Sequence, residues 1–432
     1  MVCPARPRGR AGYCPQAPRA DLNTARMADL RTLEAPAEPA PQGYSLRRDV
    51  SGSALLAGLI AVVVCYSGPL VVVLAAARAG HLDQAQTVSW IWAISIGSGV
   101  TSLLLSWRTR LPVVTAWSTP GAALLVGGLG AYSYPEAIGA YLVSGVAVTL
   151  IGVTGLFGRL IAVIPNAVVN AMLAGILFEF GTEIFSSLHS APTLVLAALA
   201  AYLVARRLLP RYAVPAALLV GAVAAASTVG LSLHLGHGGL TRPVLTMPVF
   251  SGSALVGLAL PLTLVALASQ NAPGLGVLRT FGYQPPDRLL VGATGAVSVL
   301  LAPFGGPGVN IAAITAAICA GPESHPQPRR RYPAGMSIGV CYLVVGCFGG
   351  VLVSLFAGLP AALVAVVGGV ALLGAFQGSL AAALADERGR EAAAVTFLAT
   401  TSGMTLFGIG AAFWGLLLGV GTQLVLTARK RA

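Results

Sequence analysis

The chain has 432 residues, of which 56% are hydrophobic and only 9% are charged, and its mean hydropathy is +0.82. About a quarter of the residues of a soluble domain are charged, so this composition excludes a soluble globular protein and indicates a membrane protein. The net charge of +12 does not indicate nucleic-acid binding. The arginines of the chain lie in an N-terminal tail and in short connections between apolar runs, which is the distribution that sets the orientation of membrane proteins.

Residues 1–49 are rich in Pro, Ala and Arg without apolar periodicity, so we expect a disordered cytoplasmic tail that is not a signal peptide. From Ser51 onward, apolar runs of about the length needed to cross a bilayer follow one another. We expect about 14 transmembrane segments, at 52–78, 86–107, 112–129, 135–157, 165–186, 191–209, 212–231, 252–272, 287–302, 304–320, 334–357, 359–384, 391–408 and 410–428.

The positions of the basic residues predict the orientation. Of the 26 Lys and Arg residues, only Arg78 and Arg242 fall in connections that these segments place on the outer side. Because Lys and Arg accumulate in cytoplasmic connections, we expect an even number of segments with both termini in the cytoplasm. The expected location is the cell membrane, inner or plasma, with multiple passes.

Four motifs of the first half recur in the same order in the second half. The pairs are Ser51 with Ser251 (both beginning SGSAL), Tyr134-Pro135 with Tyr332-Pro333, Ile164 with Leu359, and Pro120-Gly121 with Pro307-Gly308. Seven segments per repeat is an odd number, so the second repeat must enter the membrane from the opposite face. Inverted repeats with broken helices are typical of secondary transporters. The alternative is a single unduplicated bundle whose Ala- and Gly-rich helices resemble one another.

Segments three and ten are interrupted by proline and glycine. Segment three reads LPVVTAWSTPGAALLVGGLG and segment ten reads APFGGPGVNIAAITAAICAG, each with a helix-forming run after the break. Because proline fits the first turn of a helix, each break predicts an extended stretch leading into a half-helix that begins near the middle of the membrane. Lipid offers no partners to the free N–H groups there, and their partial positive charge favours an anion. The alternative is kinks that serve packing alone.

The candidate binding site combines both breaks with a polar pair in segment eight. A buried Gln-Asn pair is costly without partners, so we expect Gln270 and Asn271 either to bind a ligand or to satisfy unwound backbone. The expected substrate-binding residues are Trp117, Ser118, Thr119, Pro120, Gly121, Gln270, Asn271, Gly306, Gly308, Val309 and Asn310. No Asp or Glu lies in the middle of segments three, eight and ten, so the site accepts an anion without repulsion.

Other functional classes lack the residues they need. Glu179 is the deepest acidic residue near the membrane and is a candidate proton carrier; alternatively, its carboxylate reaches the membrane surface. The cysteines show no metal-ligand spacing, and His234 and His237, which have ligand-like spacing, are expected to be solvated loop residues. No nucleophile or acid–base pair inside the membrane predicts an enzyme. We therefore expect no catalytic residues, no metal and no cofactor. A channel would need a continuous polar lining, which these segments do not offer.

Three stretches resemble the benzoate/proton symporter family. They are TAWSTPGAAL from Thr115, ASQNAPGLGVL from Ala268 and APFGGPGVNIAAITAAICAGPESHP from Ala302. The resemblance extends from about residue 45 to residue 428. That family is similar in design to the uracil/proton and sulfate-type transporters. The resemblance therefore implies an all-α fold of seven-plus-seven inverted repeats with broken half-helices in segments three and ten.

The same resemblance implies a core domain that holds the site and a gate domain against which the core moves. Segments one to four and eight to eleven form the core, at residues 50–157 and 252–357. Segments five to seven and twelve to fourteen form the gate, at residues 158–251 and 358–428. A homodimer through the gate domain is the implied assembly.

The resemblance also narrows the substrate. The nucleobase carriers have glutamates at about the positions of Gln270 and Val309, and their absence here speaks against a nucleobase and fits a carboxylate. We expect uptake of benzoate or a similar aromatic carboxylate, with the ring against Trp117. Proton coupling is implied by the resemblance alone, with Glu179 or the substrate itself as the carrier. The alternative is another small anion or a nucleobase-like substrate on the same fold.

Overall fold

The structure is a computed structural model that describes residues 46–163, 165–228, 239–407 and 409–428. The expected tail at 1–45, the end of expected segment seven at 229–231 and the C-terminus at 429–432 lie outside the described residues. The last four residues of the expected tail are described and differ from expectation, because Leu46–Asp49 form a helical turn. The buried Asp49 carboxylate accepts a hydrogen bond from the Tyr332 hydroxyl at 3.0 Å, which ties this turn to the second half.

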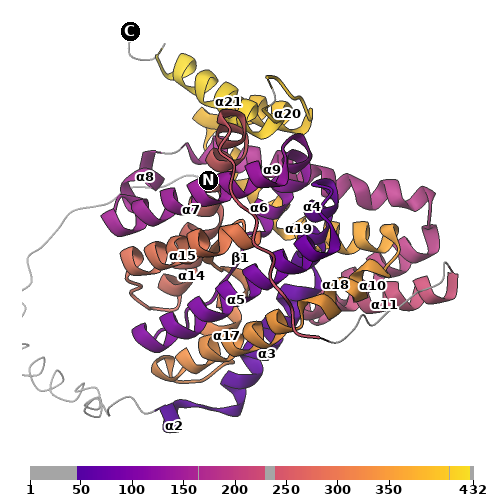
Figure 1. Ribbon diagram of the computed structural model, residues 1–432, viewed down its shortest axis with the longest axis vertical. Helices are drawn as coiled ribbons and strands as arrows, with labels where there is room; N and C mark the ends of the chain where they lie inside the picture. Colours follow the sequence, from indigo (N-terminus) through magenta and orange to yellow (C-terminus); the bar gives the residue numbers. More distant parts are fainter. Residues whose placement is uncertain (1–45, 164, 229–238, 408, 429–432) are drawn as a thin grey trace, which may run out of the picture. The chain divides into compact units, whose positions relative to one another are not determined.

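The described residues are mostly helical, with two short strands (Figure 1). The elements of the first half are α2 (Leu46–Asp49), α3 (Gly52–Ser67), α4 (Pro69–Ala79), α5 (Gln84–Thr109), β1 (Thr115–Trp117), α6 (Thr119–Gly128), α7 (Tyr134–Thr154), α8 (Phe157–Val163), α9 (Asn166–Ser186), α10 (Pro192–Leu208) and α11 (Ala213–Thr228). Those of the second half are α12 (Gly252–Ala254), α13 (Leu260–Val265), α14 (Ala272–Thr280), α15 (Asp287–Leu301), β2 (Val309–Ile311), α16 (Ile314–Ala320), α17 (Tyr332–Cys347), α18 (Gly349–Ala357), α19 (Ala361–Leu384), α20 (Arg390–Thr401) and α21 (Ala411–Ala428). The π-helical turns Leu255–Ala259 and Ala266–Asn271 join α12, α13 and α14 into one segment.

Seven helices in the described part of the chain are long and apolar enough to cross a membrane. An eighth is the pair α17 and α18, which bends by 72° at its break. Three further apolar helices are shorter and cover Thr119–Ala131, Ala213–Thr228 and Ala411–Leu426. These helices confirm a polytopic α-helical membrane protein, and the number of about 14 segments stays a prediction.

Repeated motifs begin helices in both halves. Ser51 and Ser251 cap α3 and α12, each accepting a hydrogen bond from the backbone N–H three residues later. Such a cap satisfies one of the N–H groups that a helix start leaves unpaired. The Tyr-Pro pairs begin α7 at Tyr134 and α17 at Tyr332. Each of these motifs therefore begins a helix in the first half and another in the second half.

The two interrupted segments meet in a two-stranded antiparallel sheet, where Ala116 of β1 lies opposite Asn310 of β2. A serine of the preceding helix holds each strand. Ser102 of α5 accepts a hydrogen bond from the N–H of Thr115 at 2.9 Å. Ser298 of α15 accepts one from the N–H of Val309 at 2.8 Å. Each extended stretch thus finds partners that lipid cannot offer. We expected the extended stretches from the sequence, but not their pairing.

Two sets of helices pack mainly among themselves. In the first set, α17 packs against α3 and α5, and α15 packs against α7. This set carries the strands, because β1 contacts α5 and β2 contacts α15. In the second set, α9 packs against α19 and α20, and α10 packs against α11 and α19. The yellow helices α20 and α21 lie together at one end of this set in Figure 1.

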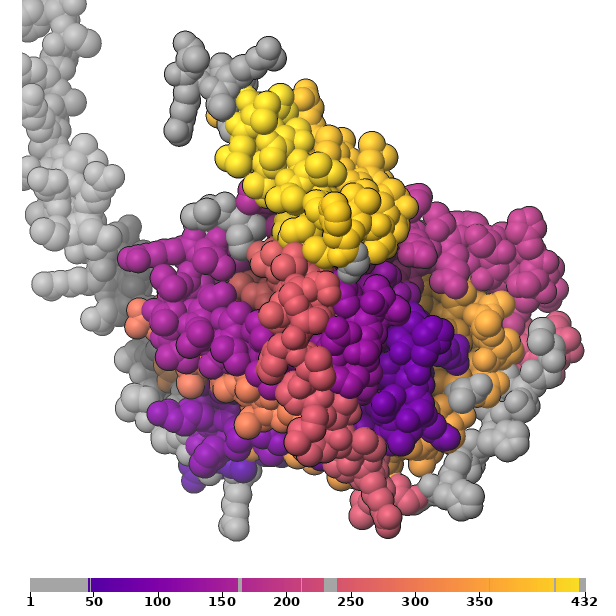
Figure 2. All heavy atoms as spheres, turned by 45° about the horizontal axis from the view of Figure 1, so that its top comes forward, coloured from indigo at the N-terminus to yellow at the C-terminus, as the bar shows by residue number. Residues whose placement is uncertain are grey.

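An extended connection, residues 239–250, crosses the surface before α12 and is visible as a salmon band in Figure 2. Its backbone is held to the first set of helices at three points. The N–H groups of Thr241, Thr246 and Val249 donate to the carbonyls of Cys347, Pro303 and Pro135. The connection between the two halves is therefore fixed along its described length to the helices that carry the strands.

Helices α7 and α15 approach so closely that glycine is needed at their crossing. A Cβ on Gly152 would lie 2.7 Å from the Cα of Gly292. A Cβ on Gly295 would lie 2.5 Å from the backbone nitrogen of Thr149. Backbone atoms cannot rotate away as a flexible side chain can. The two helices are therefore held at a separation that any added methyl group would increase.

We expect Gly152→Ala to lower the free energy of unfolding by about 1–3 kcal/mol, because the methyl group forces α7 and α15 apart. Gly181→Ala in α9 is the matched control, since a Cβ there meets nothing within 4 Å and alanine favours a helix. Thermal unfolding in detergent measures both variants. An unfolding temperature of the Gly152→Ala variant equal to that of the wild type would contradict the close contact.

Candidate functional site

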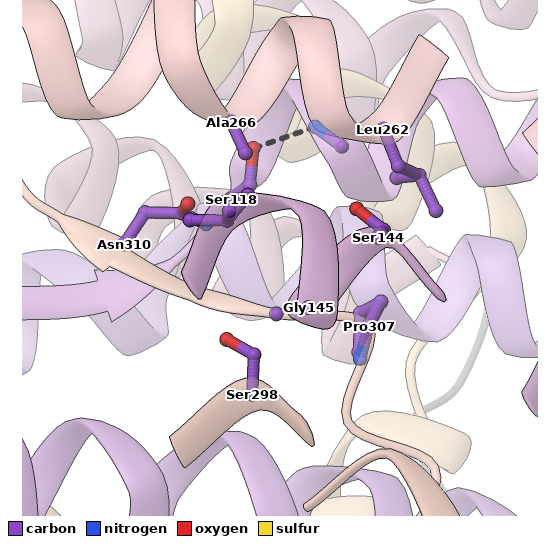
Figure 3. A pocket seen from close by; sticks show the side chains of 11 residues that line it. Ser118, Ser144, Gly145, Leu262, Ala266, Ser298, Pro307 and Asn310 are labelled. Carbon is purple, nitrogen blue, oxygen red and sulfur yellow. Dashed lines mark hydrogen bonds between the residues drawn. The ribbon is translucent and has the colours of Figure 1, made fainter. Parts of the chain in front are cut away.

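A small cavity lies where elements of both halves meet, and Figure 3 shows most of its side chains. It is bounded by the start of α6, by α7, by α13 and the π-helical turn after it, by α15 and by the stretch that leads into β2. The lining residues are Ser118, Gly121, Ser144, Gly145, Val148, Leu262, Ala266, Ser298, Pro307, Gly308 and Asn310.

Four residues of the predicted site line this cavity, namely Ser118, Gly121, Gly308 and Asn310. The lining residues of α7, α13 and α15 were not predicted from the sequence. A signal for some of them exists: residues 144, 145 and 148 follow helical spacing, and the serines at 144 and 298 interrupt apolar runs. Single serines are too common in apolar helices for this signal to identify a site without the fold.

The start of α6 lies at the cavity, as the break in segment three predicts. The helix begins at Thr119, and Pro120 occupies its first turn. Ser118 at the N-cap accepts a hydrogen bond from the N–H of Gly121 at 2.9 Å, the dashed line in Figure 3. Since both Ser118 and Gly121 line the cavity, the partial positive charge of this helix start lies beside the open space.

Segment ten differs from the prediction, because its half-helix begins later. Gly306 and Gly308 precede the strand β2, and α16 begins only at Ile314. Gly308 has a φ of 149°, a conformation that L side chains rarely adopt. The following N–H, of Val309, is taken by Ser298. The chain therefore continues from the break as a strand and not as a helix.

The expected match between the Pro-Gly pairs of segments three and ten is wrong for the same reason. Pro120 lies in the first turn of α6, whereas Pro307 precedes β2. The strands β1 and β2, which pair with each other, begin 194 residues apart, at Thr115 and Val309. This separation is close to the spacing of 195–200 residues between the other three matched motifs.

Asn271 takes the second of its two expected roles, that of satisfying unwound backbone. Its Oδ1 accepts a hydrogen bond from the N–H of Ile311 at 2.9 Å. Its Nδ2 donates to Oδ1 of Asn310 at 3.4 Å. Asn271 is fully buried and does not line the cavity. Asn310, opposite Ala116 in the sheet, reaches the cavity instead.

Two serines that were not predicted from the sequence bring hydroxyl groups to the cavity (Figure 3). Ser144 of α7 accepts a hydrogen bond from the hydroxyl of Thr263 in α13 at 3.0 Å. Ser298 of α15 donates to the carbonyl of Thr294 at 2.8 Å and accepts from the N–H of Val309 at 2.8 Å. Ser298 is therefore mainly a support of the strand, whereas Ser144 keeps its hydrogen.

Trp117 does not line the cavity. Its ring packs against Tyr66 and Tyr342, with centroid distances of 5.1 and 5.9 Å. The indole is 3% exposed, and its N–H has no hydrogen-bond partner among the described residues. Trp117 thus belongs to a buried aromatic cluster next to the site and does not form the wall that we expected for a substrate ring.

The remaining predicted residues do not line the cavity. Thr119 and Pro120 follow Ser118 in α6. Gly306 and Val309 flank the Pro-Gly pair of segment ten, and Gln270 is half-buried in the π-helical turn before Asn271. Glu179, the candidate proton carrier, is exposed on α9 and is not among the lining residues.

The cavity offers hydroxyl, amide and backbone groups, and none of its lining residues is Asp, Glu, Lys, Arg or His. Its free space admits about one water molecule. A ligand with an aromatic ring therefore requires the surrounding helices to move apart. The arrangement suits reversible binding of a small anion and contains no nucleophile with an adjacent base.

Comparison with known proteins gives the family. Residues 48–425 match the family model described as benzoate membrane transport protein. The chain is 39% identical over 393 residues to the benzoate membrane transport protein of Acinetobacter baylyi, covering 89% of this chain and 98% of that protein. It is 43% identical over 374 residues to the inner membrane protein YdcO of Escherichia coli, covering 84% of this chain and 93% of that protein.

Solved structures show the fold. The transmembrane domain of the cyanobacterial bicarbonate transporter BicA is similar with a TM-score of 0.53 and 14% identity, covering 87% of this chain and 97% of that one. SLC26A9 is similar with a TM-score of 0.60 and 14% identity, covering 98% of this chain and 73% of that one. The matches in sequence lead to one conclusion: the chain belongs to the benzoate membrane transport protein family and is a membrane transporter, not an enzyme.

Proposed function

We propose that this protein takes up benzoate or a similar aromatic carboxylate together with protons across the cell membrane. The observation that carries the proposal is the cavity at the start of α6, which has hydroxyl and amide groups and no charged side chain among its lining residues. A helix start and polar hydrogens attract an anion, and no carboxylate repels it. The similarity to a protein named benzoate membrane transport protein supports this choice of substrate.

In the proposed pose, the carboxylate lies between the start of α6 and Asn310. The ring lies against Val148, Leu262 and Ala266, the apolar residues of the lining. These residues replace Trp117 as the proposed ring contacts, because Trp117 packs into the aromatic cluster. The small free space means that binding accompanies a movement of α7, α13 and α15 away from α6.

We also propose that the fold consists of seven-plus-seven inverted repeats with both termini in the cytoplasm. The antiparallel pairing of β1 with β2 supports this, as do the equivalent roles of Ser102 and Ser298 beneath the two strands. The helices that carry the strands, α3, α5, α7, α15 and α17, are the proposed core. The set of α9, α10, α11, α19, α20 and α21 is the proposed gate and dimer surface.

A second candidate substrate is a smaller anion without a ring. The small free space of the cavity favours it, since such an ion needs less movement of the helices. The fold is also similar to that of a protein described as a bicarbonate transporter. A donor-lined cavity binds either ligand, so the two candidates differ in the apolar contacts that only an aromatic ring makes.

Uptake of labelled benzoate into proteoliposomes tests the proposal. We expect saturable uptake that increases several-fold when an inward proton gradient is imposed. Unlabelled benzoate should compete, whereas bicarbonate and uracil at equal concentration should not. Uptake that is absent, or that does not respond to the gradient, would refute proton-coupled benzoate transport. Competition by bicarbonate alone would select the second candidate.

We expect Asn310→Ala to raise the KM for benzoate about tenfold, because the cavity loses an amide donor to the carboxylate. Asn170→Ala is the matched control, since the amide of Asn170 in α9 donates only to the carbonyl of Asn166 in its own helix. Initial rates of uptake at varied benzoate concentration measure both. Equal KM values for the two variants would remove Asn310 from the site.

We propose Glu179 as the proton carrier, since it and Glu183 are carboxylates that α9 exposes. The expected effect of Glu179→Gln is loss of the stimulation by the proton gradient, with exchange of labelled for unlabelled benzoate retained. Exchange moves no net proton and serves as the internal control. Full stimulation in this variant would exclude Glu179 and leave the substrate as the carrier.

A further inference from the structure

We propose that Thr263 and Asn271 are positioning residues that turn the hydrogen of Ser144 and the NH₂ group of Asn310 towards the cavity, where both act as hydrogen-bond donors. Neither residue lines the cavity. The inference rests on the proposed function and adds a rule of specificity to it: the site selects an ionised carboxylate and rejects the neutral amide of the same shape. The polar groups of the cavity already have partners within the protein, and these partners decide which atoms remain for a ligand.

Thr263 determines the orientation of Ser144. A serine hydroxyl has one hydrogen and two lone pairs, and one lone pair of Ser144 accepts the hydrogen bond from Thr263 at 3.0 Å. Thr263 is buried in α13 and shares its hydrogen with the carbonyl of Ala259 at 2.7 Å. Ser144 donates to no acceptor among the described residues. Its hydrogen is therefore left for a ligand in the cavity.

A backbone N–H determines the orientation of the two asparagines. The N–H of Ile311 can only donate, so the atom of Asn271 that lies 2.9 Å away must be the carbonyl oxygen. The amide nitrogen of Asn271 then lies 3.4 Å from Asn310, and the facing atom of Asn310 must be its oxygen. The NH₂ group of Asn310 is thereby turned to the cavity.

The other two hydroxyls complete the set. The N–H of Gly121 donates to the oxygen of Ser118 at 2.9 Å, which leaves the hydrogen of Ser118 for the cavity. Ser298 uses its hydrogen on the carbonyl of Thr294 and receives the N–H of Val309. Ser118, Ser144 and Asn310 thus each offer a donor to one space, and each has one lone pair of its oxygen occupied by another protein group.

The chemistry of the ligand follows from this arrangement. An ionised carboxylate only accepts hydrogen bonds, and its charge makes them about twice as strong as neutral ones. An amide would place its NH₂ against the donors, and a protonated acid would do the same with its hydroxyl. We expect the wild type to prefer benzoate over benzamide by at least about tenfold.

Competition against uptake of labelled benzoate in proteoliposomes tests the role of Thr263. Thr263→Val keeps the shape and removes the donor, and Thr263→Ser keeps the donor. In the valine variant we expect the inhibition constant of benzoate to rise about five- to tenfold and that of benzamide to change less than about twofold. The serine variant loses the methyl group but keeps the donor, so it should keep the preference of the wild type. A loss of packing alone would weaken the preference in both variants.

Asn271→Asp tests the asparagine pair through a gain of binding. A carboxylate still accepts from the N–H of Ile311 but cannot donate, so Asn310 should turn its NH₂ towards residue 271 and its oxygen towards the cavity. Benzamide should then inhibit about fivefold better than in the wild type. Repulsion by the added charge would weaken benzoate but cannot improve the binding of a neutral amide.

The outcomes separate this inference from the proposed function. Absence of benzoate uptake by the wild type would refute the proposed function. Benzoate uptake with equal competition by benzamide would refute the proposed orientation of the donors while leaving the proposed function intact. A Thr263→Val variant that elutes as a single species in detergent and keeps the wild-type preference would refute the role of Thr263. An unchanged inhibition constant of benzamide in the Asn271→Asp variant would refute the role of Asn271.

Discussion

A backbone that leaves helical geometry inside a membrane must find its hydrogen-bond partners within the protein, because lipid offers none. Segments three and ten meet this constraint together. Their extended stretches pair as β1 and β2, and the N–H groups of Thr115 and Val309 donate to serines of α5 and α15. The crossing of α7 and α15 at glycine keeps these two helices, which both line the cavity, close together.

The hydrogen bonds that satisfy the backbone also orient the groups of the cavity. Asn271 accepts from the backbone of β2 and thereby turns Asn310, and the N–H of Gly121 occupies the oxygen of Ser118. The stability of the broken segments and the orientation of the groups that line the cavity therefore depend on the same bonds. Neutral donors also bind an anion less tightly than a buried positive charge would, because no unpaired charge is left in the protein when the anion leaves. Such a site suits a transporter, which has to release what it binds.

Much of the fold could be predicted because it depends on local pattern. The expected segments 86–107, 165–186 and 359–384 correspond to α5, α9 and α19 within a few residues. The start of α6 at Thr119 could also be predicted, because a serine cap followed by proline is a local signal. The start of α16 could not, since Val309–Ile311 extends only through a partner strand 194 residues earlier in the chain.

For the same reason, the residues of the candidate site could be predicted only in part from the sequence. The residues at the breaks, Ser118, Gly121, Gly308 and Asn310, are indicated by the interruption of apolar runs, and they line the cavity. Trp117 has the chemistry to contact a ring, but its neighbours Tyr66 and Tyr342 lie on other helices and take up its surface. Ser144 carried no local signal strong enough to distinguish it from other serines.

Sequence alone was enough to predict a helical membrane protein with two interrupted segments, and no Asp or Glu lies in the middle of either segment. These properties follow from composition, helical length and the chemistry of proline and glycine, all of which act over a few turns. Which residues face the cavity, and which atoms they present to it, became evident from the folded chain. Those choices depend on hydrogen bonds such as those from Thr263 to Ser144 and from Asn271 to Asn310, whose partners are far apart in the chain and meet only after folding.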